Sequence, residues 1–180
     1  MLFRSSLVGG LEPEVEAMVP ILPGERGAPG WPDGVVGSMT HCDGYRAAAV
    51  APADLAVGIG LDAEPHGPLP DGVLGMVTRP EERPRLDELS RACPDVHWDR
   101  LLFTIKESVY KVWFPITRRW LDFEGASVHI DPDAQRFVAE LQVPGPTVNG
   151  AELTRLAGRY LIEDGVVIST IVLPREPAGG

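Results

Sequence analysis

Two acidic residues stand two positions apart at the end of an apolar run that begins at Leu55. They are Asp62 and Glu64. Because side chains alternate along a β-strand, both carboxylates point to the same side. Neighbouring carboxylates repel each other, and a divalent cation with oxygen ligands, such as Mg2+, relieves that repulsion. The pair is therefore a candidate metal site, although a strand that leaves the core often ends in exposed acids with no such role.

A second charged group lies downstream and contains Lys106, Glu107 and Lys111. On a helix, Glu107 and Lys111 share one face with Thr104, whereas Lys106 lies about 100° around the axis. The plain interpretation is a surface ion pair between Glu107 and Lys111, worth a few tenths of a kcal/mol. The functional interpretation is three acids for one cation, with two lysines for the phosphates of a substrate.

These side chains must be positioned by a strand and a helix. The continuous apolar run from Leu55 to Leu61 predicts a strand that is covered on both faces. Apolar residues at three- and four-residue spacing predict a helix from Trp98 to about Trp113. Asp95 could cap the start of this helix, and Pro115 is expected to end it.

The remaining chain predicts an α+β protein, with a proline- and glycine-rich arm over residues 1–34. Asp164-Gly165 is a two-residue hairpin signal. Further strands are expected at 35–41, 45–50, 126–130, 136–143, 158–163 and 166–173, and short helices at 73–77 and within 81–92.

Composition excludes several classes of protein. The 180 residues carry a formal net charge of -10, which argues against a nucleic-acid binder because such a protein needs a basic face. Two cysteines, Cys42 and Cys93, are too few for a disulfide framework, which favours a reducing cytoplasm. We expect neither a signal peptide nor a membrane span, since every apolar run is shorter than the roughly 18 residues that a span requires.

Several motifs together resemble one known family. Gly60-Leu61-Asp62-Ala63-Glu64 and the segment from Phe103 to Lys111, F-T-I-K-E-S-V-Y-K, are similar to the paired signature of the Sfp-type 4'-phosphopantetheinyl transferases. The segments Gly27–Pro32 and Gly37–Cys42 resemble its proline-rich stretch and its strand ending in a serine- or threonine-histidine pair. Lys111 to Glu124 resembles the actinobacterial branch that includes the enterobactin-synthetase component D enzymes.

The resemblance covers the chain from about residue 20 to residue 173 and implies a fold. That fold has two lobes related by a pseudo-twofold axis, each a small antiparallel sheet packed on helices. We expect an N-terminal lobe over residues 1–54, a C-terminal lobe over 55–175 and a flexible tail at 176–180. Residues 1–19 lack the arginine-containing helix of the family, so the N-terminal lobe is expected to be shortened.

The resemblance also implies a reaction. The phosphopantetheine arm of coenzyme A would pass to a serine of an acyl or peptidyl carrier protein, releasing 3',5'-ADP. Such carriers serve polyketide, nonribosomal peptide and siderophore synthesis. We expect a monomer in the cytoplasm that uses Mg2+ or Mn2+ and binds neither nucleic acid nor membrane.

Roles for individual residues follow from the same resemblance. Asp62, Glu64 and Glu107 would bind the metal, while Glu107 and Lys111 would be catalytic, with Glu107 as base directly or through a water. The residues implied in coenzyme A binding are Arg26, Thr40, His41, Asp62, Lys106 and Lys111.

Two other functions stay open on the sequence. The chain could be an impaired relative that binds coenzyme A or a carrier without turnover. It could also be a Mg2+-dependent hydrolase of a nucleotide diphosphate, because the same three acids would serve a water nucleophile.

Overall fold

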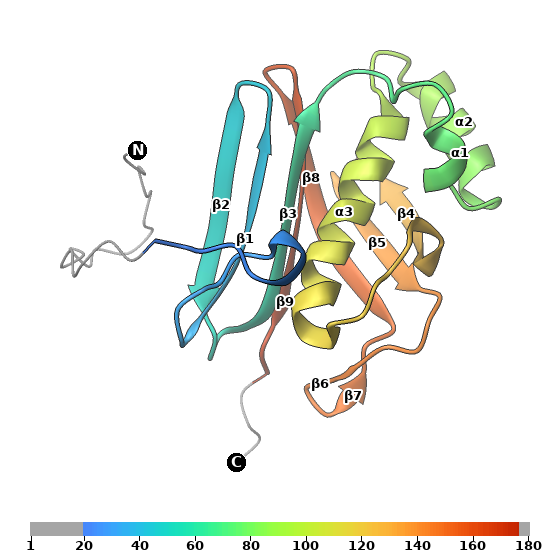
Figure 1. Ribbon diagram of the computed structural model, residues 1–180. Coiled ribbons are helices and arrows are strands. Elements are labelled where there is room, and N and C mark those ends of the chain that lie inside the picture. The colour runs from blue at the N-terminus through green and yellow to red at the C-terminus, as the bar shows by residue number, and fades with distance from the viewer. Residues whose placement is uncertain (1–19, 177–180) are drawn as a thin grey trace.

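The computed structural model describes residues 20–176 as a mixed arrangement of helices and antiparallel sheets, as predicted (Figure 1). The largest sheet has five strands in the order β3-β9-β8-β5-β4. Helix α3, Trp98–Thr117, runs across one face of this sheet. The five strands are β3 Ala56–Pro65, β9 Val166–Pro174, β8 Arg155–Glu163, β5 Arg136–Leu141 and β4 Ala126–Asp131.

The apolar stripe of α3 forms the centre of the core. Leu101, Ile105 and Val112 are fully buried in one cluster with sheet residues such as Phe137 and Ile171. This burial supplies most of the stability of a helix in a protein of this size, since helix propensity alone is marginal.

The prediction that Pro115 ends this helix is wrong, because α3 continues through it to Thr117. Pro115 removes the N–H that would have bonded the carbonyl of Lys111, and other bonds close the last turn. The Thr117 hydroxyl donates to the carbonyl of Trp113 at 2.9 Å, and the N–H of Arg118 donates to that of Phe114 at 2.8 Å. The suggested cap is also absent, since His97 occupies the N-cap without a side-chain bond.

Strand β3 lies unusually close to α3. Gly58 and Gly60 face the helix, and a Cβ atom on Gly60 would overlap the backbone carbonyl of Ser108. Hydrogen bonds also link α3 to β9. The hydroxyls of Ser108 and Ser169 are 2.6 Å apart, and the hydroxyl of Ser169 donates to the carbonyl of Thr104. The spacing between strand and helix is therefore fixed by backbone contact and buried hydrogen bonds.

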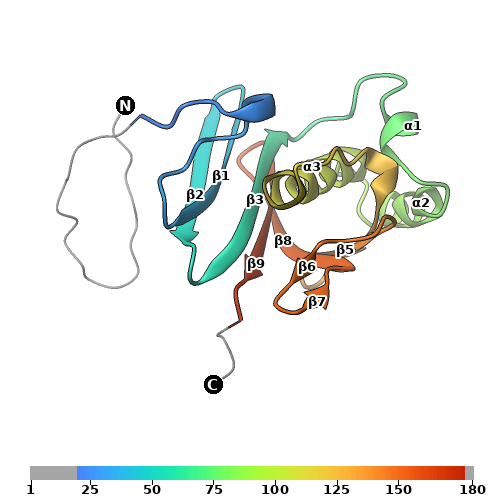
Figure 2. The ribbon, with the colours of Figure 1, turned by 60° about the horizontal axis from the view of Figure 1, so that its bottom comes forward.

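The hairpin of β1, Val35–Cys42, and β2, Tyr45–Pro52, forms a separate two-stranded sheet. Figures 1 and 2 place it beside the edge of β3 that is not paired with β9. Two hydroxyls join the sheets: Ser38 accepts from the N–H of Leu61 at 3.0 Å, and Thr40 accepts from that of Ala63 at 2.9 Å. Within residues 20–176, the chain before this hairpin contains only the three-residue 3-10 helix η1, Glu25–Gly27, and no α-helix.

The remaining elements are short and surround α3. They are η1 Glu25–Gly27, α1 Leu74–Val77, α2 Glu82–Ala92, η2 Phe123–Gly125, β6 Thr147–Val148 and β7 Ala151–Glu152. The Asp164-Gly165 turn joins β8 to β9 with φ of 51° and 75°, which confirms the predicted hairpin. The predicted arm falls partly on residues 1–19, which lie outside the described residues. Between 20 and 176, no helix is long and apolar enough to cross a membrane.

Candidate active site

Strand β3 and helix α3 bring the three predicted acids into one neighbourhood. Asp62 and Glu64 lie on the face of β3 that carries Gly60 toward α3, and Glu107 comes from the facing helix. Burial, followed by the charge of Asp62, raises the pKa of Glu64 and of Glu107 above the usual carboxyl value. The acids are thus near enough to oppose one another's ionisation.

Asp62 is the centre of this group and is 5% exposed. Its Oδ1 accepts from the Nζ of Lys111 at 2.8 Å and from the hydroxyl of Thr40 at 3.3 Å. Its Oδ2 is buried without a hydrogen-bond partner in the described part of the chain. An unpaired buried carboxylate oxygen is costly, so a cation at this atom fits the chemistry of the site.

Glu64 forms an ion pair with Arg100. The Nη1 of Arg100 lies 3.1 Å from the Oε2 of Glu64, and the same guanidinium donates to the carbonyls of Gly67 and Pro68. Across residues 20–176, no three acidic, histidine or cysteine side chains are already gathered for a metal. The donor types of these acids suit Mg2+, and one oxygen of Glu64 is engaged by Arg100.

Lys111 connects the hairpin, β3 and α3. Its Nζ donates to the carbonyls of Met39 and Leu61, at 3.1 and 2.9 Å, in addition to Asp62. The side chain remains 27% exposed. The lysine thus fixes Asp62 and still reaches solvent beside the acids.

Lys106 does not join this group, although its sequence neighbour Glu107 does. Its Nζ is 2.7 Å from the Oε2 of Glu82 and donates to the carbonyls of Val77 and Phe123, both at 2.8 Å. The structure therefore places Lys106 in the interior, whereas the sequence suggested a contact with substrate phosphates. Glu82 was missed by sequence reasoning, since it lies on a separate helix and no motif marks it.

The side chains of Thr40 and His41 point to opposite faces of β1, because the two residues are adjacent in the strand. Thr40 is buried against β3, whereas His41 is exposed and, by alternation, belongs to the opposite face of β1. Arg26 comes from the N-terminal arm and lies against Trp120 of the cavity beside Glu107, with its Cζ 5.5 Å from the ring centre. The structure thus brings Thr40 to the acids and does not bring His41 with it.

A cavity of about 130 Å³ opens beside Glu107. The ring of Tyr110 packs against Phe114 and Trp120, with centroids 5.7 and 5.1 Å apart, and its buried hydroxyl has no partner among the described residues. Burial raises the pKa of Tyr110. The residues that line the cavity are Lys106, Glu107, Val109, Tyr110, Trp120, Leu121, Asp122, Phe123 and Ala126.

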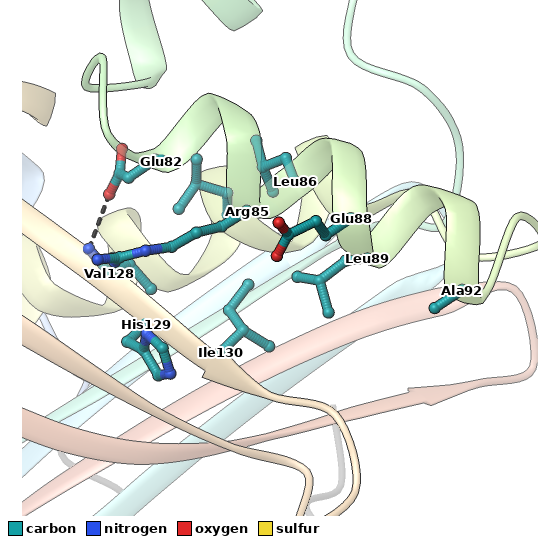
Figure 3. A pocket seen from close by; sticks show the side chains of 10 residues that line it. Glu82, Arg85, Leu86, Glu88, Leu89, Ala92, Val128, His129 and Ile130 are labelled. Carbon is teal, nitrogen blue, oxygen red and sulfur yellow. Dashed lines mark hydrogen bonds between the residues drawn. The ribbon is translucent and has the colours of Figure 1, made fainter.

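A larger cavity, about 250 Å³, lies between α2 and β4 and contains none of the predicted site residues (Figure 3). Arg85, Glu88 and His129 stand at its sides, over an apolar floor. Its size alone does not make it the site, because the group of opposed carboxylates lies elsewhere.

Comparison with known proteins gives consistent results along the chain. A family model described as the 4'-phosphopantetheinyl transferase superfamily matches residues 58–161, and a model of the 4'-phosphopantetheinyl transferase N-terminal domain matches residues 11–51. The first range includes the three acids and both lysines of α3, and the second includes Arg26, Thr40 and His41.

The chain is also similar to three curated proteins that are named 4'-phosphopantetheinyl transferases. The chain is 58% identical over 160 residues to the 4'-phosphopantetheinyl transferase Svp of Streptomyces mobaraensis, covering 89% of this chain and 65% of Svp. It is 48% identical to PptT of Mycobacterium tuberculosis, covering 86% of this chain and 69% of PptT, and 50% identical to Npt of Nocardia iowensis, covering 87% and 72%. Both are also named 4'-phosphopantetheinyl transferases, and the chain spans about two thirds of the length of these relatives.

Proposed function

Because the chain belongs to the 4'-phosphopantetheinyl transferase superfamily, we propose that it transfers the 4'-phosphopantetheine arm of coenzyme A to a carrier protein. The acceptor is a serine hydroxyl of an acyl or peptidyl carrier. A bond forms between the serine oxygen and the β-phosphorus, the bond from that phosphorus to the bridging oxygen breaks, and 3',5'-ADP leaves. The observation that supports this most is the group of opposed carboxyls around the unpartnered Oδ2 of Asp62.

We infer that Asp62, Glu64 and Glu107 hold Mg2+, with Mn2+ as a substitute. When bound, the cation would polarise the diphosphate oxygens and neutralise the leaving group. Asp62 would offer its unpartnered Oδ2 to the cation, and Glu64 would offer the carboxylate that Arg100 contacts in this structure.

Glu107 is the proposed base for the carrier serine, directly or through a water. It lies between the acid group and the cavity lined by Tyr110 and Trp120. That cavity has aromatic walls and one unpartnered hydroxyl, which suit the amide-containing pantetheine arm. Lys111 holds Asp62 and presents its exposed side to a phosphate, while Arg26 and His41 remain proposed contacts to coenzyme A.

Three further assignments belong to the same proposal. The division into lobes at residues 54 and 55 follows the change from the β1–β2 sheet to the five-stranded sheet. A cytoplasmic location is consistent with the free thiols of Cys42 and Cys93. We also propose that the protein acts as a monomer.

The test is a mass-spectrometric transfer assay with coenzyme A, Mg2+ and a panel of apo-carriers. Wild-type protein should add the arm to at least one carrier. Asp62→Ala and Glu107→Ala should each lose transfer while keeping their circular dichroism spectra. Glu140→Ala, which removes an exposed carboxylate of β5, should retain it.

Two outcomes would overturn the proposal. Near-normal turnover by Asp62→Ala would remove the acids from the mechanism. Release of 3',5'-ADP from coenzyme A without any carrier, with no mass gain when a carrier is present, would identify a hydrolase instead.

A further inference from the structure

The two charged residues buried most deeply near the site form an ion pair with each other. Lys106 of α3 and Glu82 of α2 lie 2.7 Å apart, and both side chains are 2% exposed. Burial lowers the pKa of Lys106, and its contact with Glu82 opposes that shift. A lysine so enclosed has no free N–H to offer a substrate.

Every donor and acceptor of the pair is used. The three protons of the Lys106 ammonium match three oxygens: one on Glu82 and the carbonyls of Val77 and Phe123. Glu82 also accepts from the N–H groups of Arg79, at 2.7 Å, and Val128, at 2.7 Å; the latter bond is dashed in Figure 3. A buried ion pair is tolerated when its remaining hydrogen bonds are satisfied in this way.

The partners of the pair belong to separate elements. Val77 ends α1, Glu82 begins α2, Phe123 opens η2 and Val128 lies in β4. Lys106 therefore bonds α3 to three of these elements, and Glu82 extends the network to β4. One of them, η2, lies in the segment from Trp120 to Ala126 that supplies the outer wall of the cavity beside Glu107.

We propose that Lys106 and Glu82 are positioning residues that hold this cavity wall against the α3 turn that carries Glu107. The inference rests on the proposed transferase function. Lys106 is one residue before the base, so the bond from its Nζ to the carbonyl of Phe123 sets how far the wall lies from Glu107. Without the pair, the wall would lose this bond to α3, and the position of the pantetheine arm beside Glu107 would be less well defined.

The experiment compares Lys106→Met, Glu82→Gln and the double variant. Each single change strands a buried polar partner, so each should lower the unfolding midpoint by roughly 10 °C. The double variant should regain most of that loss, because the partners of a buried pair couple. The KM for coenzyme A should be measured at a temperature well below the unfolding midpoints of all variants. It should rise on the order of tenfold in each single variant and return toward the wild-type value in the double variant.

Two matched variants complete the design. Lys111→Met removes the other lysine of α3 and should lose turnover with no recovery when Glu82→Gln is added. Arg155→Met, at an exposed position of β8, should match wild type in midpoint and KM. If Lys106→Met is too unstable to assay, Glu82→Asp gives a milder test because it keeps the charge and shortens the reach to Val128.

A higher KM for Lys106→Met, with an unchanged midpoint and no recovery in the double variant, would show a phosphate contact and overturn the proposal. An unchanged KM in every folded variant would also overturn it, since the pair would then serve stability alone. If wild-type protein modifies no carrier, the transferase assignment fails. In that case, two measurements on the same variants still test the positioning. One is whether the double variant recovers the unfolding midpoint lost in the single variants, and the other is the affinity for coenzyme A measured by calorimetry.

Discussion

The contact between β3 and α3 can be tested with one added methyl group. In Gly60→Ala, the new Cβ would overlap the carbonyl oxygen of Ser108 and lie 2.9 Å from the Cγ2 of Val112. Gly60 does not have a positive φ, so the backbone conformation itself admits alanine. The whole penalty therefore arises from the closeness of strand and helix.

The expected magnitude follows from what can move. Overpacking costs about 1–3 kcal/mol, and the upper end applies because a backbone carbonyl has no rotamer to change. Alanine also makes the unfolded chain less flexible than glycine does, which stabilises the folded state by about 0.4–1 kcal/mol and offsets part of this cost. The net loss of about 2 kcal/mol should lower the unfolding midpoint by roughly 4–8 °C.

The assay is thermal unfolding followed by circular dichroism, with Gly58→Ala as the matched control. A Cβ on Gly58 would meet the side chains of Ile116 and Val112 at an ordinary 3.5 Å, so that variant should equal or slightly exceed wild type. Gly60→Ala should also reduce kcat on the order of tenfold or more, because it shifts Glu107 relative to Asp62. Equal midpoints for the two variants would refute the proposed packing.

Two other substitutions test the electrostatics and the joint between the sheets. Glu107→Gln should stabilise the metal-free protein near pH 7, because burial raises the pKa of Glu107 and ionisation then opposes folding. That gain in stability should vanish below about pH 4, where the carboxyl is protonated in both the folded and the unfolded state. The measurement is thermal unfolding at several pH values in the presence of EDTA. A gain that stays constant with pH would contradict the prediction. Thr40→Val keeps the shape but removes the acceptor for the N–H of Ala63, so it should cost about 1–2 kcal/mol and speed hydrogen exchange at that amide. Unchanged exchange at Ala63 would show that the hydroxyl does not join the sheets.

Local patterns predicted the elements well. The apolar spacing gave the start of α3 at Trp98, and Asp164-Gly165 gave the turn between β8 and β9. The alternation of β3 placed Asp62 and Glu64 on one face, and the structure shows that face directed at α3. These features depend on residues that are close in sequence, so periodicity and turn chemistry are sufficient to find them.

The partners of the charged residues could not be predicted in the same way. Arg100 binds Glu64 and Glu82 binds Lys106, and each pair joins two different elements whose packing sets the contact. Helical geometry separates Lys106 from Glu107 by about 100°, but only the fold decides what lies on each side. The family resemblance did not show that this lysine is enclosed, because a motif records residue types and not their surroundings.

The order of strands in the large sheet has a consequence for how the site is made. Asp62 lies on β3, whose ladder partner is β9, so Asp62 pairs with Ser169 near the other end of the described chain. Such a non-local pairing forms late, because a long loop must close before the contact is gained. During synthesis, β3, which carries the acids, is made well before β9, with which it pairs. The proposed site is therefore among the last parts of the molecule to be completed, and a nascent chain that stops before β9 carries the acids without the strand that pairs with theirs.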